Sequence, residues 1–141
     1  MRFWDSSALL PLFVAEPQTH RARSWLRTDS EILVWTLTRL EVLSAFARRN
    51  RERAPSSALA DGRKAFMRAY DQWNEVTEVG AVRRHAERIV ETHPLRAADA
   101  LQLGAALVAA EDDPAHLVFV TLDARLAVAA EKEGFRVLGP K

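Results

Sequence analysis

The stretch HPLRAADALQLGAALVAA, residues 93–110, decides how the chain is expected to fold. From Ala97 onward it is almost entirely alanine, leucine and valine, which predicts a helix that is apolar on nearly every side and therefore buried. Two polar side chains interrupt this helix, Asp99 in its first turn and Gln102 at the i,i+3 position on the same face. A carboxylate on a buried helix needs either a compensating partner or a function.

Around this helix, strands and helices are predicted to alternate along the whole chain. Strands are expected over residues 2–4, 31–35, 74–79, 116–121 and 135–138, and helices over 6–15, 18–28, 38–53, 56–70, 81–93, 97–110 and 124–133. Pro17 separates the first two helices and Pro55 ends the third. This alternation predicts an α/β fold with a central parallel sheet that is covered on both faces. Such sheets bind ligands beyond the carboxyl ends of their strands.

The bulk composition suits one domain over residues 1–141, with 48% hydrophobic and 28% charged residues. The net charge of +1 excludes a bulk polycation, and the absence of cysteine excludes disulfides and thiolate metal sites. No apolar run approaches the ~20 residues that span a bilayer. The amino terminus lacks a basic region followed by a long apolar one. We therefore expect a cytoplasmic protein with no membrane partner.

Four acidic residues fall where a parallel sheet places its binding crevice. Asp5 ends the first predicted strand, and Asp123 directly follows the fourth. Glu41 and Asp99 lie in the first turns of two predicted helices. Each also has a local structural explanation, since Asp5 and Asp123 suit helix N-caps. Glu41 completes the T-x-x-E pattern of a capping box with Thr38, and Asp99 favours the positive end of its helix.

Four acids placed together repel one another, and the structural explanations given for each acid separately do not account for this unfavourable energy. Two carboxylates about 5 Å apart repel each other by roughly 3 kcal/mol at an effective dielectric constant of 20. A divalent cation would offset this repulsion. Carboxylates without cysteine or histidine nearby favour Mg²⁺ or Mn²⁺ over zinc. The sequence therefore predicts a carboxylate site for one of these ions, whose usual use is phosphate chemistry.

Four motifs give the chain a resemblance to a known family. They are DSSALL (5–10), TRLEVLSAFAR (38–48), LRAADALQLGAAL (95–107) and FVTLDARLAVAAEKEGF (119–135). In this order and spacing they resemble the PIN-domain ribonucleases, and in particular the VapC-like toxins of bacterial toxin–antitoxin pairs. The resemblance implies a PIN-like three-layer α/β/α sandwich and metal-dependent hydrolysis of RNA.

The resemblance also implies roles for particular residues. The acidic site for Mg²⁺ or Mn²⁺ would consist of Asp5, Glu41, Asp99 and Asp123. Ser7 would be a supporting hydroxyl, and Thr121 a weaker one. The implied partners are an RNA substrate, a small antitoxin protein that blocks the acidic crevice and a second copy of the chain in a homodimer.

Three arginines are candidate contacts to the RNA backbone. Arg48 and Arg49 belong to the run ARRNRER (47–53), which also reads as a solvated helix end stabilised by the helix dipole. Arg96 lies three residues before Asp99, where either that carboxylate or a phosphate would suit it.

One alternative function remains open at this point, a PIN-like module that binds RNA or protein without catalysis. Asp112 and Asp113, in the run EDDP, read as a solvated loop away from the metal. The four histidines show no mutual ligand spacing and read as surface residues or as neighbours of the metal ligands.

Overall fold

Five short strands pair in parallel into one sheet in the order β3-β2-β1-β4-β5. The structure is a computed structural model and describes residues 1–53 and 56–140. The strands are β1 (Arg2–Trp4), β2 (Ile32–Trp35), β3 (Asn74–Val76), β4 (Val118–Val120) and β5 (Arg136–Leu138). All four pairings are parallel, so the carboxyl ends of the strands lie along one edge.

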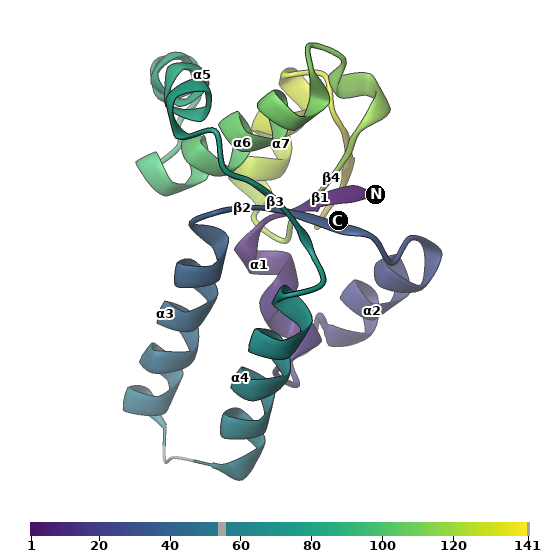
Figure 1. The fold of residues 1–141 in the computed structure, drawn as a ribbon, viewed down its shortest axis with the longest axis vertical. Coiled ribbons are helices and arrows are strands. Elements are labelled where there is room, and N and C mark those ends of the chain that lie inside the picture. Colours follow the sequence, from purple (N-terminus) through teal and green to yellow (C-terminus); the bar gives the residue numbers. More distant parts are fainter. Residues whose placement is uncertain (54–55, 141) are drawn as a thin grey trace.

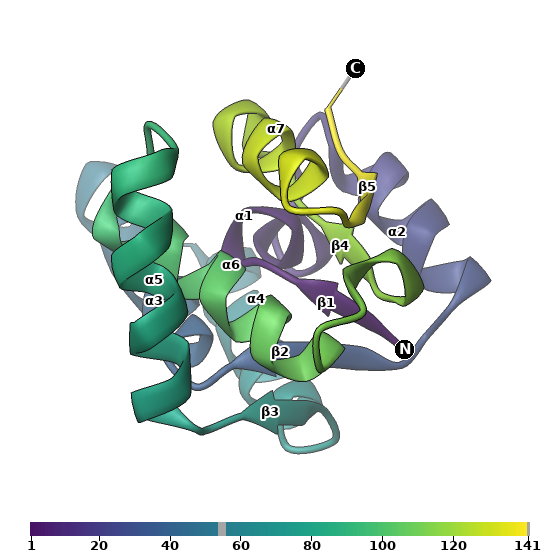
Figure 2. The same cartoon turned by 90° about the horizontal axis from the view of Figure 1, so that it is seen from above.

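Helices cover both faces of the sheet, which confirms the predicted α/β/α sandwich (Figure 1). One face carries α1 (Ser6–Leu9), the 3₁₀ turn η1 (Leu10–Leu12), α2 (Thr19–Thr28), α3 (Thr38–Glu52) and α4 (Ser57–Tyr70). The other carries α5 (Val79–Thr92), α6 (Ala97–Ala110) and α7 (Ala124–Lys132), which lie on the near side of the sheet in Figure 2, where the molecule is seen from above. A second 3₁₀ turn, η2 (Pro114–His116), precedes β4.

The core consists of two apolar clusters, one on each face of the sheet. Phe3 and Phe119 stack with ring centroids 5.4 Å apart in the cluster beneath α5, α6 and α7. Trp4, Val34 and Val120 belong to the cluster on the opposite face, against α1 to α4. Successive strand residues alternate between the two clusters. Because both faces are buried, the strands read as continuous apolar runs.

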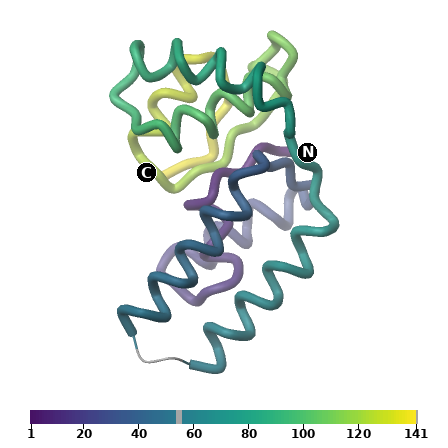
Figure 3. Tube along the Cα trace, turned by 60° about the vertical axis from the view of Figure 1, so that its left-hand side comes forward, coloured from purple at the N-terminus to yellow at the C-terminus, as the bar shows by residue number. Residues whose placement is uncertain are grey.

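Helices α3 and α4 form a hairpin that extends well beyond the sheet (Figure 3). Phe46 of α3 packs against Phe66 of α4, with ring centroids 6.3 Å apart. The Ser56 hydroxyl caps α4 by accepting a hydrogen bond from the backbone N–H of Leu59 at 3.1 Å. The helix end predicted at Pro55 lies outside the described residues.

Several predicted boundaries shift. The helix predicted to follow Gly80 begins at Val79, so Gly80 lies within the first turn of α5. The helix predicted over 6–15 ends as η1, with Pro11 near its start. The strand predicted from residue 116 begins at Val118 because Pro114 starts the turn η2.

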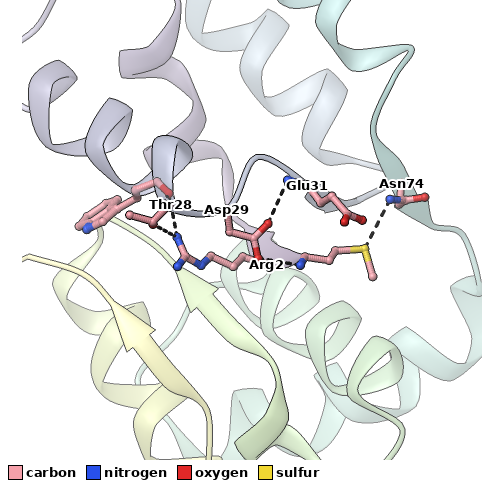
Figure 4. Close-up of polar contacts among 7 residues, drawn as sticks. Arg2, Thr28, Asp29, Glu31 and Asn74 are labelled. Atoms are coloured by element: carbon pink, nitrogen blue, oxygen red, sulfur yellow. Dashed lines mark hydrogen bonds and ion pairs between the residues drawn. The ribbon is translucent and has the colours of Figure 1, made fainter.

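The amino end of β1 is anchored by a set of paired polar groups (Figure 4). The Met1 amino group donates to Asp29 Oδ2 at 2.7 Å. The Arg2 guanidinium donates to the Trp25 carbonyl and to Thr28 Oγ1, both at 2.8 Å. These contacts tie β1 to the end of α2 at the sheet edge opposite the acids. Within residues 1–53 and 56–140, no helix has the length and apolar character needed to cross a bilayer.

Candidate metal-binding cleft

The carboxyl edge of the sheet holds one cleft, about 660 Å³ in volume, that all four predicted acids line. Asp5 follows β1 and Asp123 lies shortly after β4. Strands β1 and β4 are neighbours in the sheet. Strands β2 and β3 lie on one side of β1, and β4 and β5 lie on the other, so the strand order reverses between β1 and β4. Open α/β sheets bind ligands at such a switch point. Glu41 and Asp99 reach the same cleft from α3 and α6.

Asp5 is buried, with only 3% of its surface exposed. Its Oδ1 accepts hydrogen bonds from the Ser7 hydroxyl at 2.7 Å and from the backbone N–H of Ala8 at 3.3 Å. Burial raises the pKa of Asp5 to about 7, against the opposing hydrogen bonds from Ser7, Thr121 and Ala8, and the charge of Asp123 adds a little. Without a cation, this carboxyl group therefore holds its proton up to near neutral pH.

Two hydroxyls connect Asp5 to Asp123. Ser7 Oγ lies 3.3 Å from Thr121 Oγ1 and accepts from the backbone N–H of Leu122 at 2.9 Å. Thr121 Oγ1 in turn accepts from the backbone N–H of Asp123 at 3.0 Å. Both hydroxyls predicted to support the site thus lie between its two strand-end carboxylates.

The structural explanations for Asp5 and Asp123 coexist with their place in the cleft. Asp5 caps α1, and Asp123 caps α7 by accepting from the backbone N–H of Leu126 at 3.0 Å. Each cap uses Oδ1, which leaves Oδ2 outside the cap. Both residues can therefore hold the start of a helix and face a ligand at the same time.

The capping box predicted for Glu41 is wrong. Leu37 is the N-cap of α3, so Thr38 is already helical and makes no cap. Instead, the Gln102 amide Nε2 donates to Thr38 Oγ1 at 3.0 Å and to Glu41 Oε1 at 2.5 Å. The pKa of Glu41 is raised, first by burial and then by the charge of Asp99, although the bond from Gln102 lowers it. Gln102 thus joins α6 to α3 and fixes Glu41 at the cleft.

Asp99 is half-buried and caps nothing, because Arg96 is the N-cap of α6 and makes no side-chain cap bond. Its pKa is raised by burial and by the charge of Asp123, while Arg96 lowers it. The next residue along, Ala100, is fully buried. Asp99 is accommodated on this helix because its end of α6 opens into the cleft.

The donor set of the cleft fits a hard divalent cation. In the described ranges 1–53 and 56–140, none of the four carboxylates belongs to an ion pair. Nor do any three His, Asp or Glu side chains of those ranges stand close enough together to hold a cation as they are. Oxygen-only donors suit Mg²⁺ or Mn²⁺, whose charge would offset the repulsion.

The predicted arginine contacts divide into two groups. Arg48 and Arg96 line the cleft beside the acids. Arg49 forms an ion pair with Glu16 instead and lines a different groove, toward η1 and α4. The structure therefore gives Arg49 a place in the packing of α3 rather than at the cleft.

Two other groups lie away from the acids. Asp112 and Asp113 follow the carboxyl end of α6, roughly 20 Å along that helix from Asp99. Asp113 pairs there with His116 at 2.7 Å. His93, read from the sequence as a surface residue or a neighbour of the metal ligands, is buried and contacts Glu133 Oε2 at 2.7 Å. No periodicity in the sequence announces that contact, because it joins residues 40 positions apart.

The fold and the cleft agree with the family to which the chain belongs. The PIN domain family matches residues 2–132, and the chain is a member of it. PIN domains are generally metal-dependent nucleases. No curated protein is detectably similar to the chain.

Two solved structures share the fold. The crystal structure of PAE2754 from Pyrobaculum aerophilum is similar over 96% of this chain and 82% of its own, with 20% identity and a TM-score of 0.63. FitAB bound to an IR36 DNA fragment is similar over 99% of this chain and 95% of the other, with 16% identity and a TM-score of 0.67. At these identities, the likeness is one of fold.

Proposed function

We propose that the protein is an endoribonuclease that depends on Mg²⁺ or Mn²⁺ and acts as the toxin of a toxin–antitoxin pair in the cytoplasm. One observation carries the proposal. In a PIN-domain chain, four carboxylates from four different segments line a single cleft, and none of them forms an ion pair among the described residues. Mutual repulsion disfavours four charged carboxylates in one cleft, and the burial that raises the pKa of Asp5 disfavours its charged form. A bound cation would offset both effects.

Within this proposal, each side chain of the cleft takes a role. Asp5 and Asp99 hold the ion, and Glu41 and Asp123 complete the site or position a second ion. A bound divalent ion would neutralise the phosphate and activate water for hydrolysis of the phosphodiester bond. Ser7 and Thr121 are proposed to hold Asp5 and the start of α7 in register, on the strength of their hydrogen bonds.

The substrate and partners belong to the same proposal. Arg48 and Arg96, at the cleft, are the contacts to the RNA backbone, whose charge they complement. A small antitoxin would cover the cleft, and the fold likeness to FitAB supports a two-component system. The exposed apolar side chains Leu37, Leu40 and Val79 are available for a homodimer interface. A monomer across micromolar concentrations in sedimentation would contradict the dimer.

The test is cleavage of total cellular RNA by purified, antitoxin-free protein with Mn²⁺, with Mg²⁺ and with EDTA. Asp99→Asn should reduce cleavage about 100-fold or more, because it removes a ligand charge from the site. Asp113→Asn is the matched control, since it makes the same change on the surface at the far end of α6. Discrete fragments that need metal and disappear only in Asp99→Asn would support the nuclease.

The same experiment tests the non-catalytic alternative. Tight RNA binding by folded, Mn²⁺-loaded protein without cleavage would favour a binding module over an enzyme. Identical fragments from wild type and Asp99→Asn would identify a contaminating nuclease.

A further inference from the structure

The cleft continues past the acids into a second lobe, about 460 Å³ in volume. The lobe is lined by Pro94, Arg96, Asp99, Asp123, Ala124 and Arg125. Arg96, Asp99 and Asp123 also line the main part of the cleft, so the two hollows share the wall that carries the acids. Arg48 lines only the main part and Arg125 only the second lobe. Asp99 and Asp123 thus lie on the wall between two parts that each contain an arginine of their own.

Among the residues that the structure describes, neither arginine of the second lobe forms an ion pair, although the charge of Arg96 lowers the pKa of Asp99. Arg96 is the N-cap of α6 and Arg125 is the second residue of α7, and both are exposed. A cation at the positive end of a helix is unfavourable for that helix. The stability of α6 and α7 therefore does not account for these side chains.

An RNA strand carries phosphate groups that these two arginines can bind. The four acids repel a phosphate backbone, so a strand that lies across them needs cations beside them. A bond inside a strand has a phosphate neighbour on both sides, and arginine binds phosphate through its planar fork of N–H donors. A cleft with an arginine in each of its two parts matches that arrangement of charge.

We propose that the second lobe binds the backbone phosphate next to the one that is cleaved, with Arg125 as the main donor and Arg96 assisting. A single-stranded RNA then crosses the acids from the part with Arg48 to the part with Arg125. This subsite rests on the proposed nuclease function and deepens it, because a strand held on both sides of the acids is cut internally.

The first test measures binding of a fluorescently labelled, 12-nucleotide, random-sequence RNA in an Asp5→Asn background that does not cleave. Arg125→Gln should weaken binding about three- to tenfold and lower the slope of log Kd against log salt by about 0.7, the value for one phosphate contact on a single strand. Arg136→Gln is the matched control, since Arg136 is exposed at the amino end of β5, the sheet edge opposite the cleft. It should change neither quantity.

The second test removes the charge from the RNA instead. It uses an RNA of defined sequence taken from a fragment that wild type cuts in the cleavage assay. An uncharged methylphosphonate beside the bond cut in that RNA should weaken binding to the Asp5→Asn protein but have no further effect once Arg125→Gln is present. Equal affinities and salt slopes for Arg125→Gln and Arg136→Gln would overturn the subsite while leaving metal-dependent cleavage intact. Absence of cleavage by Mn²⁺-loaded wild type would overturn the nuclease function, and the binding assay would still decide on the subsite.

Discussion

The two ends of α7 place carboxylates in opposite environments. At its far end, Glu133 receives two hydrogen bonds from the Arg88 guanidinium, at 2.7 and 3.1 Å, and contacts His93 at 2.7 Å. The hydrogen bonds from Arg88 are the main reason that the pKa of Glu133 is lowered to about 2, with His93 contributing. At its near end, Asp123 shares the cleft with Asp5, whose pKa is raised to about 7 by burial, with the charge of Asp123 adding a little.

The difference shows which acids stabilise the folded state and which destabilise it. Glu133 follows α7 and contacts both Arg88 of α5 and His93 just after α5. Its negative charge therefore stabilises the folded state. Asp5 is more deeply buried yet has no cation beside it among the described residues. A buried, unpaired carboxylate destabilises a fold, and such sites are expected where function requires them.

Substitution of Asp5 by asparagine should show the largest effect. The folded-state pKa of Asp5 lies above its unfolded value of 3.8, so the folded protein binds the proton more tightly. The stability gained from that proton is present at low pH and is lost as the pH rises from about 4 through 7. At about 1.4 kcal/mol per pKa unit, the loss is on the order of 4 kcal/mol.

The measurement is urea unfolding in EDTA between pH 4.5 and 8. Asp5→Asn keeps an oxygen for the α1 cap but cannot ionise, so its stability relative to wild type should increase with pH. If the difference in stability between the two proteins did not depend on pH, burial would not raise the pKa of Asp5.

The sequence predicts the sheet and the membership of the cleft because both follow from local pattern. Apolar runs give the strands, and acids at strand ends and helix starts lie at one edge of any parallel sheet. The predicted caps at Asp5 and Asp123 likewise depend on neighbours within three residues, and they form.

The polarity of Gln102 on a buried helix is consistent with a side chain that orients a carboxylate, but the particular partner of each side chain was not predictable in this way. Thr38 and Glu41 have the spacing of a capping box, but Gln102, 61 residues beyond Glu41, takes both side chains. Arg49 pairs with Glu16, 33 residues earlier in the chain. Such partners are brought together by the packing of separate elements, which no local pattern in one sequence specifies.

A substitution of Gln102 tests whether its hydrogen bond to Glu41 prepares the cleft to bind a cation. Gln102→Met keeps the volume of this buried side chain but removes the amide that holds Glu41. We expect Mn²⁺ affinity to fall about 10- to 100-fold, as for other residues that orient a metal ligand. The stability of the metal-free fold should change by only about 1 kcal/mol.

Calorimetric titration with Mn²⁺ and urea unfolding in EDTA measure the two quantities separately. Gln72→Met is the control, because Gln72 is exposed beyond the end of α4 and away from the cleft. If Gln102→Met bound Mn²⁺ as tightly as wild type, whether or not its stability fell, Gln102 would only pack α6 against α3 and would not orient a metal ligand.

Glu133→Gln should give the smallest effect, with the sign opposite to that of Asp5→Asn. The pKa of Glu133 is lowered in the folded state, so its contribution to stability is present above about 4.5 and is lost as the pH falls toward 2. Because the Arg88 side chain is 49% exposed and screened by water, we expect a loss of about 1–2 kcal/mol at pH 7. Urea unfolding should show the two proteins converging below pH 4. A constant difference down to pH 2 would assign the effect to packing, and the contrast between the two ends of α7 would then not be one of charge.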